Sequence, residues 1–358
     1  PMTYSIYDHN YITERNIVRE IPYILEHTPS FVALSEGGAG IGFTDFRIRG
    51  MNSNTTNVTI NGIPLIDAES RQTLWHHLPD FASSVGQIKI TRGAGSSTCG
   101  TYAYGSSIDI TTESPSTKPY GDLTINGGSF NTIKASISAG TGIMKNGFSI
   151  DLRMAKILSD GYIDRADINH NAIMLSATWR GKNNSLNANI IYGNQKSKIT
   201  MWGCPAQYIG YNRRYNSSGE YFDAIGRKEY YENEEEKSTQ AHVQLIYAQK
   251  IWSNVELNFK LHYNHDDGYF EEFKNAQPFS NYGLPNIVLP VVVSGNGTTI
   301  STTTTIFRTD LTRRRMATKN YYGGIITATH KIGNFVNTFG GSVNKMSGQY
   351  YGILTWMQ

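Results

Sequence analysis

Beyond residue 120, apolar and polar side chains alternate along the chain in one segment after another. In the stretch FSIDLRMA (148–155), every second residue carries a large apolar side chain. Successive side chains of a strand point to opposite faces, so each such segment predicts a strand with one apolar and one polar face. Counting them predicts nine strands, in the segments 122–129, 131–140, 147–158, 170–180, 185–197, 239–249, 254–264, 319–330 and 335–346.

The connections between these strands differ in length in a regular way. GKNN near residue 182, QKIWSN near 251 and KIGN near 332 predict tight turns, whereas 199–236 and 266–312 are long. Tight turns therefore fall at one end of the strands and long loops at the other, as in a transmembrane β-barrel with short periplasmic turns. About ten residues per strand also suit a membrane. A large soluble β-sandwich or propeller is the alternative on pattern alone.

The first 115 residues have a different character. YITERN and IPYILEHTP predict short helices, and FRIRG, NVTINGIPL, QIKITRG and SSIDITT predict strands. The change falls in SPSTKPY, so we expect a mixed domain in 1–115 and a strand domain in 116–358. The start, PMTYSIYDHN, lacks the basic and apolar regions of a signal peptide, and we expect it to be processed or trimmed.

Composition narrows the possible functions. The 35 glycines and 23 tyrosines suit a large antiparallel β protein, and a net charge of +3 is too small to indicate nucleic-acid binding. No run of 18 apolar residues exists, which excludes a transmembrane helix. Cys99 and Cys204 are 105 positions apart, without metal-ligand spacing, and we expect unpaired thiols.

The glycine-rich stretch TRGAGSSTCGTYAYGSSIDITT (91–112) invites comparison with phosphate-binding loops. Such loops lead from a strand into a helix, whereas this one joins two strands, and Thr101 stands where a P-loop has its lysine. We therefore do not expect a nucleotide. A G-x-S-x-G nucleophile motif is also missing, and nothing supports an enzyme.

The order of motifs in the first domain resembles the plug of TonB-dependent outer-membrane receptors. An Arg-Gly, an Asn-Gly turn, a short amphipathic segment, a second Arg-Gly and a glycine-rich loop follow one another at Arg49-Gly50, Asn61-Gly62, 78–85, Arg92-Gly93, Gly100 and Gly105. SGEYFDAIGRKEYYEN and LHYNHDDGYFEEFK resemble early barrel segments of these receptors. One departure is Ala94, where many members carry proline.

The resemblance implies a mainly β fold, with a mixed α/β plug domain inside a transmembrane antiparallel β-barrel. The family barrel has 22 strands and this chain supplies about nine, so we expect a fragment. It also implies that Arg49 and Arg92 pair with glutamates of the inner barrel wall, which we expect beyond residue 358.

The implied partners are the TonB-ExbB-ExbD energy-coupling complex, outer-membrane lipid and lipopolysaccharide, a small-molecule ligand and a surface lipoprotein, with no nucleic acid and no cofactor. The implied location is the outer membrane of a Gram-negative cell. Three functions compete: an importer of a ferric chelate or similar micronutrient, an importer of glycans or peptides working with a lipoprotein, and a surface adhesin or phage receptor that transports nothing.

By alignment to the plug motifs, the outward-facing apices are 36–41, 52–56 and 67–77. We expect ligand contacts from these apices and from the first long loop, with the candidates Asn52, Asn54, Thr55, Glu69, Arg71, Gln72, Trp75, His76, His77, Tyr208, Tyr211 and Arg213. His76 and His77 raise the option of haem or a metal, but neighbours on one strand face opposite sides, so we expect no direct metal role. Packing against the barrel wall is the alternative for the two histidines.

Overall fold

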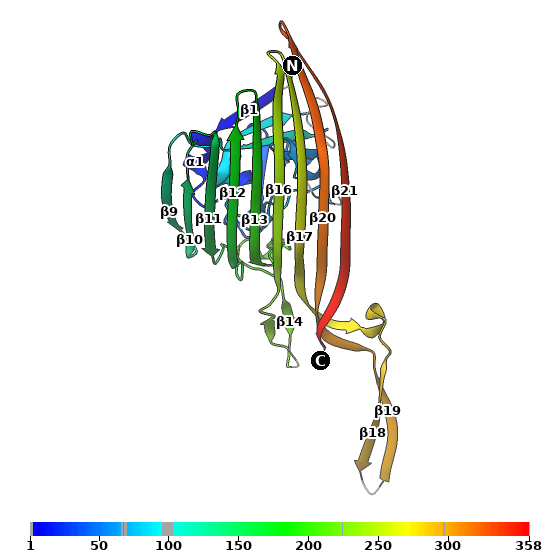
Figure 1. Cartoon of the computed structure of the whole chain (residues 1–358). Helices are drawn as coiled ribbons and strands as arrows, with labels where there is room; N and C mark the ends of the chain where they lie inside the picture. The colour runs from blue at the N-terminus through cyan, green and yellow to red at the C-terminus, as the bar shows by residue number, and fades with distance from the viewer. Residues whose placement is uncertain are drawn as a thin grey trace.

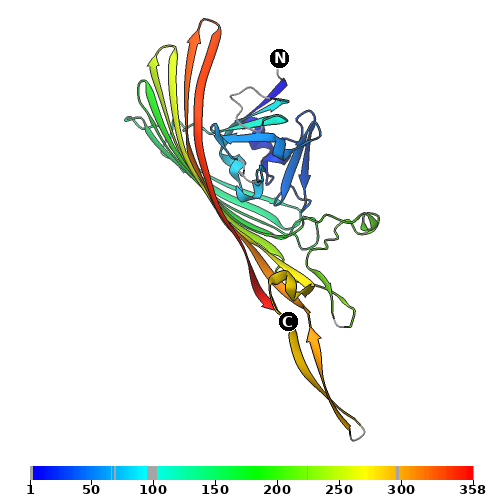
Figure 2. The same ribbon diagram turned by 90° about the vertical axis from the view of Figure 1, so that its right-hand side faces the viewer.

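The computed structural model describes residues 3–65, 67, 70–94, 103–223, 225–295 and 298–357. In it, a large curved sheet holds a smaller mixed domain on its concave side (Figures 1 and 2). Within the described residues, no helix has the length and apolar character needed to cross a membrane. Cys99 and the centre of the glycine-rich stretch lie outside the described residues.

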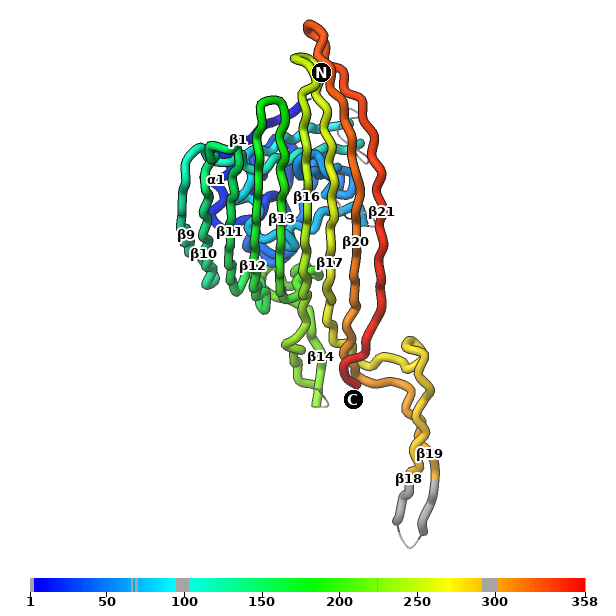
Figure 3. The backbone as a smooth tube through the Cα atoms, viewed as in Figure 1, coloured from blue at the N-terminus to red at the C-terminus, as the bar shows by residue number. Residues whose placement is uncertain are grey.

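The large sheet is antiparallel throughout and follows the chain order from one edge to the other (Figure 3). Within the described part of the chain it has nine strands, so the predicted strand count is confirmed. These strands are β9 (Tyr120–Gly128), β10 (Thr132–Gly140), β11 (Phe148–Ser159), β12 (Ile168–Arg180), β13 (Asn184–Lys198), β16 (Glu235–Trp252), β17 (Val255–Pro278), β20 (Arg308–Ile332) and β21 (Phe335–Met357).

The later strands are longer than the sequence pattern predicts. β17 runs to Pro278 and β20 begins at Arg308, so much of the predicted loop 266–312 is paired strand. The prediction failed there because HDDG and FEEF place polar residues on both faces, which interrupts the apolar alternation. Backbone pairing needs no such alternation, and the ribbon continues beyond the strictly alternating segment.

The tight turns and long connections are sorted as expected. Tight turns join β12 to β13, β16 to β17 and β20 to β21 at one end of the sheet, and the two long connections lie at the opposite end (Figure 2). The long connections contain η5 (Ala206–Tyr208), β14 (Glu220–Phe222), β15 (Lys228–Tyr230), η6 (Phe279–Tyr282), β18 (Ile287–Gly295) and β19 (Thr298–Ile306).

The two faces of the large sheet differ in polarity. On β10, Ile133 and Ile137 are 52% and 56% exposed on the convex side, whereas Lys134, Ser136 and Ser138 are buried on the other. A polar side chain turned inward must find a hydrogen-bond partner there. The small domain covers the concave face (Figure 2) and supplies Asp80 and Ser83 as partners of Lys134.

The small domain combines two sheets and short helices. One sheet has the order β1-β7-β8-β5-β6 and the other the order β2-β3-β4. Its strands are β1 (Thr3–Asp8), β2 (Phe31–Ser35), β3 (Thr44–Ile48), β4 (Met51–Asn52), β5 (Thr56–Ile60), β6 (Ile63–Pro64), β7 (Val85–Arg92) and β8 (Ser106–Thr112). Its helical segments are α1 (His9–Arg15), α2 (Ile21–Ile24), η1 (Ser53–Thr55), η2 (Trp75–His77) and η3 (Phe81–Ser84).

Local sequence accounts for these short elements. The Asp8 side chain caps α1 by accepting a hydrogen bond from the Tyr11 N–H, and Pro22 lies in the first turn of α2, where its missing N–H costs nothing. Isoleucines of β5, β7 and β8, with Phe46 of β3, fill the core. That core includes Ile191 of β13, so the apolar packing continues from the small domain into the large sheet, which is called the wall below.

The backbones of the two parts approach each other closely at Gly193 of β13. A Cβ added there would overlap the carbonyl oxygen of His77 and would lie 2.7 Å from Cδ of Pro79. Only glycine leaves room for the backbone of the small domain at this point of the wall.

We predict that Gly193→Ala loosens the small domain from the sheet, since the added methyl meets backbone atoms that have no rotamer to change. The expected cost is about 1–3 kcal/mol, as for other overpacked sites. Protease sensitivity of the small domain in detergent-solubilised protein measures it. Gly121→Ala is the matched control, because a Cβ at Gly121 on β9 meets nothing within 4 Å. Equal sensitivity of the two variants would contradict the prediction.

Candidate functional site

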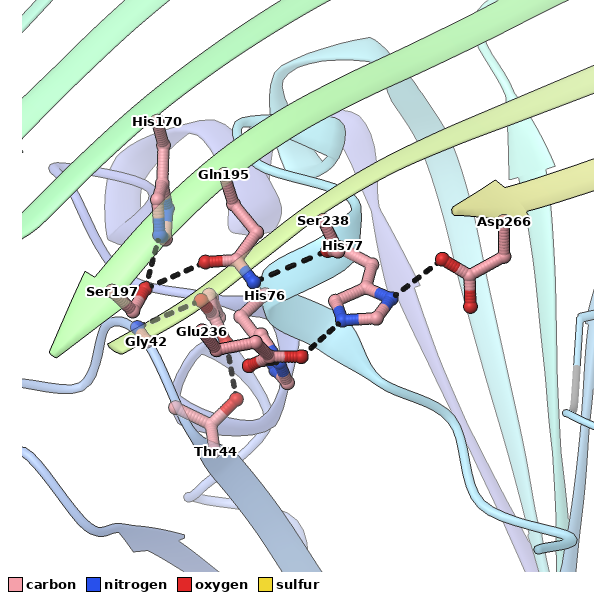
Figure 4. Close-up of polar contacts among 11 residues, drawn as sticks. Gly42, Thr44, His76, His77, His170, Gln195, Ser197, Glu236, Ser238 and Asp266 are labelled. Carbon is pink, nitrogen blue, oxygen red and sulfur yellow. Dashed lines mark hydrogen bonds and ion pairs between the residues drawn. The ribbon is translucent and has the colours of Figure 1, made fainter. Parts of the chain in front are cut away.

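A buried polar cluster lies between η2 and the wall (Figure 4). His76 Nε2 and His77 Nε2 lie 3.0 and 2.9 Å from the two carboxylate oxygens of Glu236, the second residue of β16. Their side chains are only 3–4% exposed. His77 Nδ1 faces Asp266 Oδ1 of β17 at 3.6 Å. Two neighbouring residues of the small domain thus converge on one carboxylate of the wall.

This arrangement corrects the expectation that His76 and His77 face opposite sides of a strand. They lie on the 3₁₀ helix η2, where successive side chains are about 120° apart because a turn takes three residues. Their rings meet edge to face, with centroids 4.5 Å apart. The geometric argument against a shared site was therefore wrong.

The charge around His77 is set by two carboxylates. Burial lowers the pKa of His77, but its hydrogen bond to Glu236 and the charges of Glu236 and Asp266 outweigh burial and raise that pKa above its usual value. The cluster is therefore a place where the protein stabilises positive charge.

Aromatic and hydrogen-bonded side chains close the cluster off. The Phe43 ring packs on the His76 ring at 4.6 Å, and Phe270 packs on Phe43 at 6.2 Å. On the wall, a chain of hydrogen bonds runs alongside, linking His170 to Ser197 (3.0 Å), Ser197 to Gln195 (2.8 Å) and Gln195 to Ser238 (3.1 Å) (Figure 4).

Further polar contacts fasten the small domain elsewhere. Lys134 of β10 forms an ion pair with Asp80, and both side chains are at most 3% exposed. The Asn61 amide donates to Gln244 Oε1 at 3.0 Å, and its carbonyl accepts from Lys260 Nζ at 2.8 Å. The Asn61-Gly62 turn of the plug motif is therefore a docking point on the wall.

The two arginines of the plug motif do not meet carboxylates within the described residues. Arg92 Nη1 donates to the Pro29 carbonyl at 3.1 Å, and Arg49 has a left-handed backbone with φ of 53°. Their pairing with glutamates beyond residue 358 stays a prediction.

Three expected ligand residues are buried rather than exposed. Trp75, His76 and His77 are at most 4% exposed, because η2 packs against the wall. In this conformation an external ligand has no access to them. Arg71 and Gln72 are exposed, and Glu69 lies outside the described residues.

The predicted apices do not share one end of the molecule. The Gly37 carbonyl accepts hydrogen bonds from the N–H groups of Tyr162 and Ile163, in the β11–β12 connection at the long-loop end. Asn52 pairs with Arg47 toward the opposite end of the three-stranded sheet, and Asn54 and Thr55 follow it in η1. The segments 36–41 and 52–56 therefore lie at opposite ends of the three-stranded sheet, and the ligand contacts expected of Asn52, Asn54 and Thr55 stay a prediction.

The candidates in the first long loop lie together in and beside η5. The Tyr208 ring stacks on Tyr215 at 3.9 Å, Tyr211 is 75% exposed, and Arg213 Nε donates to the Ile209 carbonyl at 3.1 Å. Their role in ligand binding stays a prediction.

The sequence interpretation missed an aromatic cavity at the same end. It has a volume of about 710 Å³ and is lined by Tyr221, Phe222, Asp223, Tyr231, Phe273, Asp310, Thr312 and Trp356. The Tyr231 hydroxyl donates to Glu271 at 2.6 Å, which fixes one side of the opening. The dense aromatics of GEYF and EYYEN were the available signal, but their acidic neighbours favoured a hydrated loop.

Comparisons with known proteins agree with this architecture. Residues 1–107 match the family described as TonB-dependent Receptor Plug Domain. A search of curated proteins found no match. Among solved structures, the "Copper transporter OprC" is 12% identical, with a TM-score of 0.68 over 98% of this chain and 47% of that one. BauA, the ferric preacinetobactin receptor from Acinetobacter baumannii, is 12% identical, with a TM-score of 0.68 over 99% and 48%.

The small domain thus matches the plug-domain family over residues 1–107, and is called the plug below, and the whole chain shares the fold of these solved receptors. The ferric citrate transporter FecA in its unliganded form shares that fold, at 12% identity and a TM-score of 0.61 over 98% of this chain and 59% of that one. The chain spans about half the length of OprC and BauA.

We predict that Lys134→Met destabilises the plug by about 3–5 kcal/mol, because it leaves the Asp80 carboxylate buried without a counter-charge. The double variant Lys134→Met/Asp80→Asn should recover most of this loss, since asparagine tolerates the left-handed backbone of Asp80 (φ 53°). Denaturant-dependent proteolysis of the plug measures both. Lys145→Met, in an exposed turn, is the control. If the plug of Lys134→Met is as stable as that of Lys145→Met, the predicted contribution of the Lys134–Asp80 ion pair is refuted.

Glu20 predicts a pH dependence of plug stability. Burial raises the pKa of Glu20 to about 7, although the charge of His76 and hydrogen bonds from the Thr44 hydroxyl and the Gly42 N–H oppose the shift. The folded state then holds a proton that the unfolded state, with a pKa near 4.5, releases. Its contribution to stability is therefore lost as pH rises through about 7.

We expect the plug to lose on the order of 1 kcal/mol of stability between about pH 6 and about pH 8 through this carboxyl. Glu20→Gln should flatten that part of the profile, because the amide keeps an acceptor for Gly42 and has no proton to release. Chemical denaturation at a series of pH values tests this, with Glu14→Gln, an exposed helix residue, as the control. An unchanged slope in Glu20→Gln would rule out Glu20 as its source.

Proposed function

We propose that the protein imports a ferric chelate or a similar micronutrient across the outer membrane of a Gram-negative cell, driven by the TonB-ExbB-ExbD complex. The observation that carries the proposal is the plug domain packed against the polar concave face of a lipid-compatible sheet. Solved receptors of this fold are described as acting on copper, ferric preacinetobactin and ferric citrate.

The character of the plug–wall interface supports a part that moves. Its outer contacts are ion pairs and hydrogen bonds, such as Lys319 Nζ with Asp67 at 2.5 Å and Asn61 with Gln244. Water can replace such partners when the two surfaces separate, so the net cost per contact is modest. A pull by the energy-coupling complex could then displace the plug without unfolding the wall.

Ligand capture is assigned to the long-loop end, where aromatic and cationic side chains gather. Lys228 Nζ lies 5.0 Å from the centre of the Tyr215 ring, and Tyr208 stacks on the same ring. The aromatic cavity adds Tyr221 and Trp356. Flat rings and cations suit a sizeable, partly aromatic anionic ligand.

The same aromatic cavity favours one alternative, the import of glycans with a surface lipoprotein, because sugar rings also pack on aromatic faces. Lipid, lipopolysaccharide and lipoprotein contacts belong to this proposal as partners of the full receptor.

We predict that Tyr221→Ala and Trp356→Ala each weaken ligand binding by tenfold or more, as for aromatic anchors in other interfaces. The assay measures uptake of a panel of iron-loaded chelates by iron-limited cells expressing the full receptor. Phe335→Ala, at the tight-turn end and 74% exposed, is the control. If the receptor supports growth on glycans but no iron uptake, the alternative is supported. If it supports neither activity, an adhesin or phage receptor is favoured.

A further inference from the structure

We propose that His76, His77 and Glu236 form a binding site for a divalent transition-metal ion that ties the plug to the barrel wall. The plug supplies two ligands from η2 and the wall supplies the third from β16. The site is independent of the transported ligand, since its side chains are buried inside the interface.

The spacing of the three donors suits such an ion. His76 Nε2, His77 Nε2 and a Glu236 carboxylate oxygen all lie within 4.8 Å of one another. Zinc sites have metal–ligand distances of about 2.0–2.2 Å, which separates tetrahedral donors by about 3.3–3.6 Å. His76 Nε2 lies 3.0 Å from Glu236 Oε2 and His77 Nε2 lies 2.9 Å from Oε1, so each contact has to lengthen by only a few tenths of an ångström to admit an ion.

The hydrogen-bond pattern also favours a bound ion over direct hydrogen bonds from the two histidines to Glu236. Two neutral histidines that donate Nε2–H to Glu236 leave both Nδ1 atoms buried, and neither has a hydrogen-bond partner among the described atoms. Moving the His77 proton to Nδ1 turns it toward Asp266 Oδ1, 3.6 Å away, and frees Nε2 to bind a metal. A carboxylate behind a ligating histidine is the usual way in which metal sites fix the imidazole tautomer.

The donor set defines the class of ion. Two imidazole nitrogens and one carboxylate oxygen suit Zn²⁺, Fe²⁺ or Co²⁺, whereas Cu⁺ prefers sulfur and Ca²⁺ prefers oxygen ligands. Phe43 covers His76 on one side, which shields the site from solvent.

An ion held this way would stabilise the closed position of the plug. Because its ligands come from both parts, the ion binds fully only while η2 rests on β16. Plug–wall association then strengthens with metal concentration in the way that any ligand favours the state it binds.

The test is a metal titration of the full receptor in detergent. After removal of metal by a chelator, ZnCl₂ and CoCl₂ are added while bound metal is measured, and the visible spectrum of Co²⁺ reports nitrogen ligation. We expect one ion per receptor. His77→Ala and Glu236→Ala should abolish this binding, and Asp266→Asn should weaken it by about 10- to 100-fold. His27→Ala, with a side chain 68% exposed on the plug, should bind like the parent protein.

The double variant His76→Gln/His77→Gln separates loss of metal binding from loss of folding, because glutamine can still donate hydrogen bonds to Glu236. It should keep the protease resistance of the plug and bind no metal. Undiminished binding by this variant, or the absence of saturable binding in the parent protein, would overturn the proposal. Neither result depends on uptake, so failure here is distinguishable from failure of the import function.

Discussion

The large sheet turns large apolar side chains to its convex face and polar side chains to its concave face, and this one separation organises the molecule. The concave face of the sheet therefore carries lysine, serine, histidine and glutamate, each of which is costly to bury alone. Lys134 shows the result: it is nearly inaccessible to solvent, and its counter-charge, Asp80, comes from the plug. The pattern that suits the membrane thus creates the surface that the plug must match.

The interface between the plug and the large sheet has an apolar centre and polar surroundings, and these two regions have different roles. The plug core reaches into the wall through Ile191, which gives the closed state a dry centre. Around it, contacts such as those of Asn61 with Gln244 and Lys260 set the register of plug on sheet. Gly193 fixes how near the two backbones approach. The interface therefore combines an apolar centre with polar contacts that fix the register.

The sequence was most informative where a single constraint acted alone. Strict alternation on β10 to β13 predicted those strands, and the ordered glycine and arginine motifs predicted the plug. Prediction from the sequence failed where side-chain polarity and backbone pairing pointed to different structures. Near Asp266 the acidic residues interrupted the alternation although backbone pairing continued, so β17 was predicted too short. The histidine pair was placed on a strand because nothing local distinguishes η2 from an extended segment, and Glu236, its partner 159 residues beyond His77, is brought there by the fold.

Glu236 also lies close to the base of a long connection. The long connection 199–234 ends two residues before it, and that connection is closed at its base by a hydrogen bond from Ile199 N–H to the Glu234 carbonyl at 3.1 Å, while Asn216 holds the Ile199 carbonyl from within the loop. The base of the long connection and the carboxylate that contacts both histidines therefore lie only two residues apart, at the start of β16.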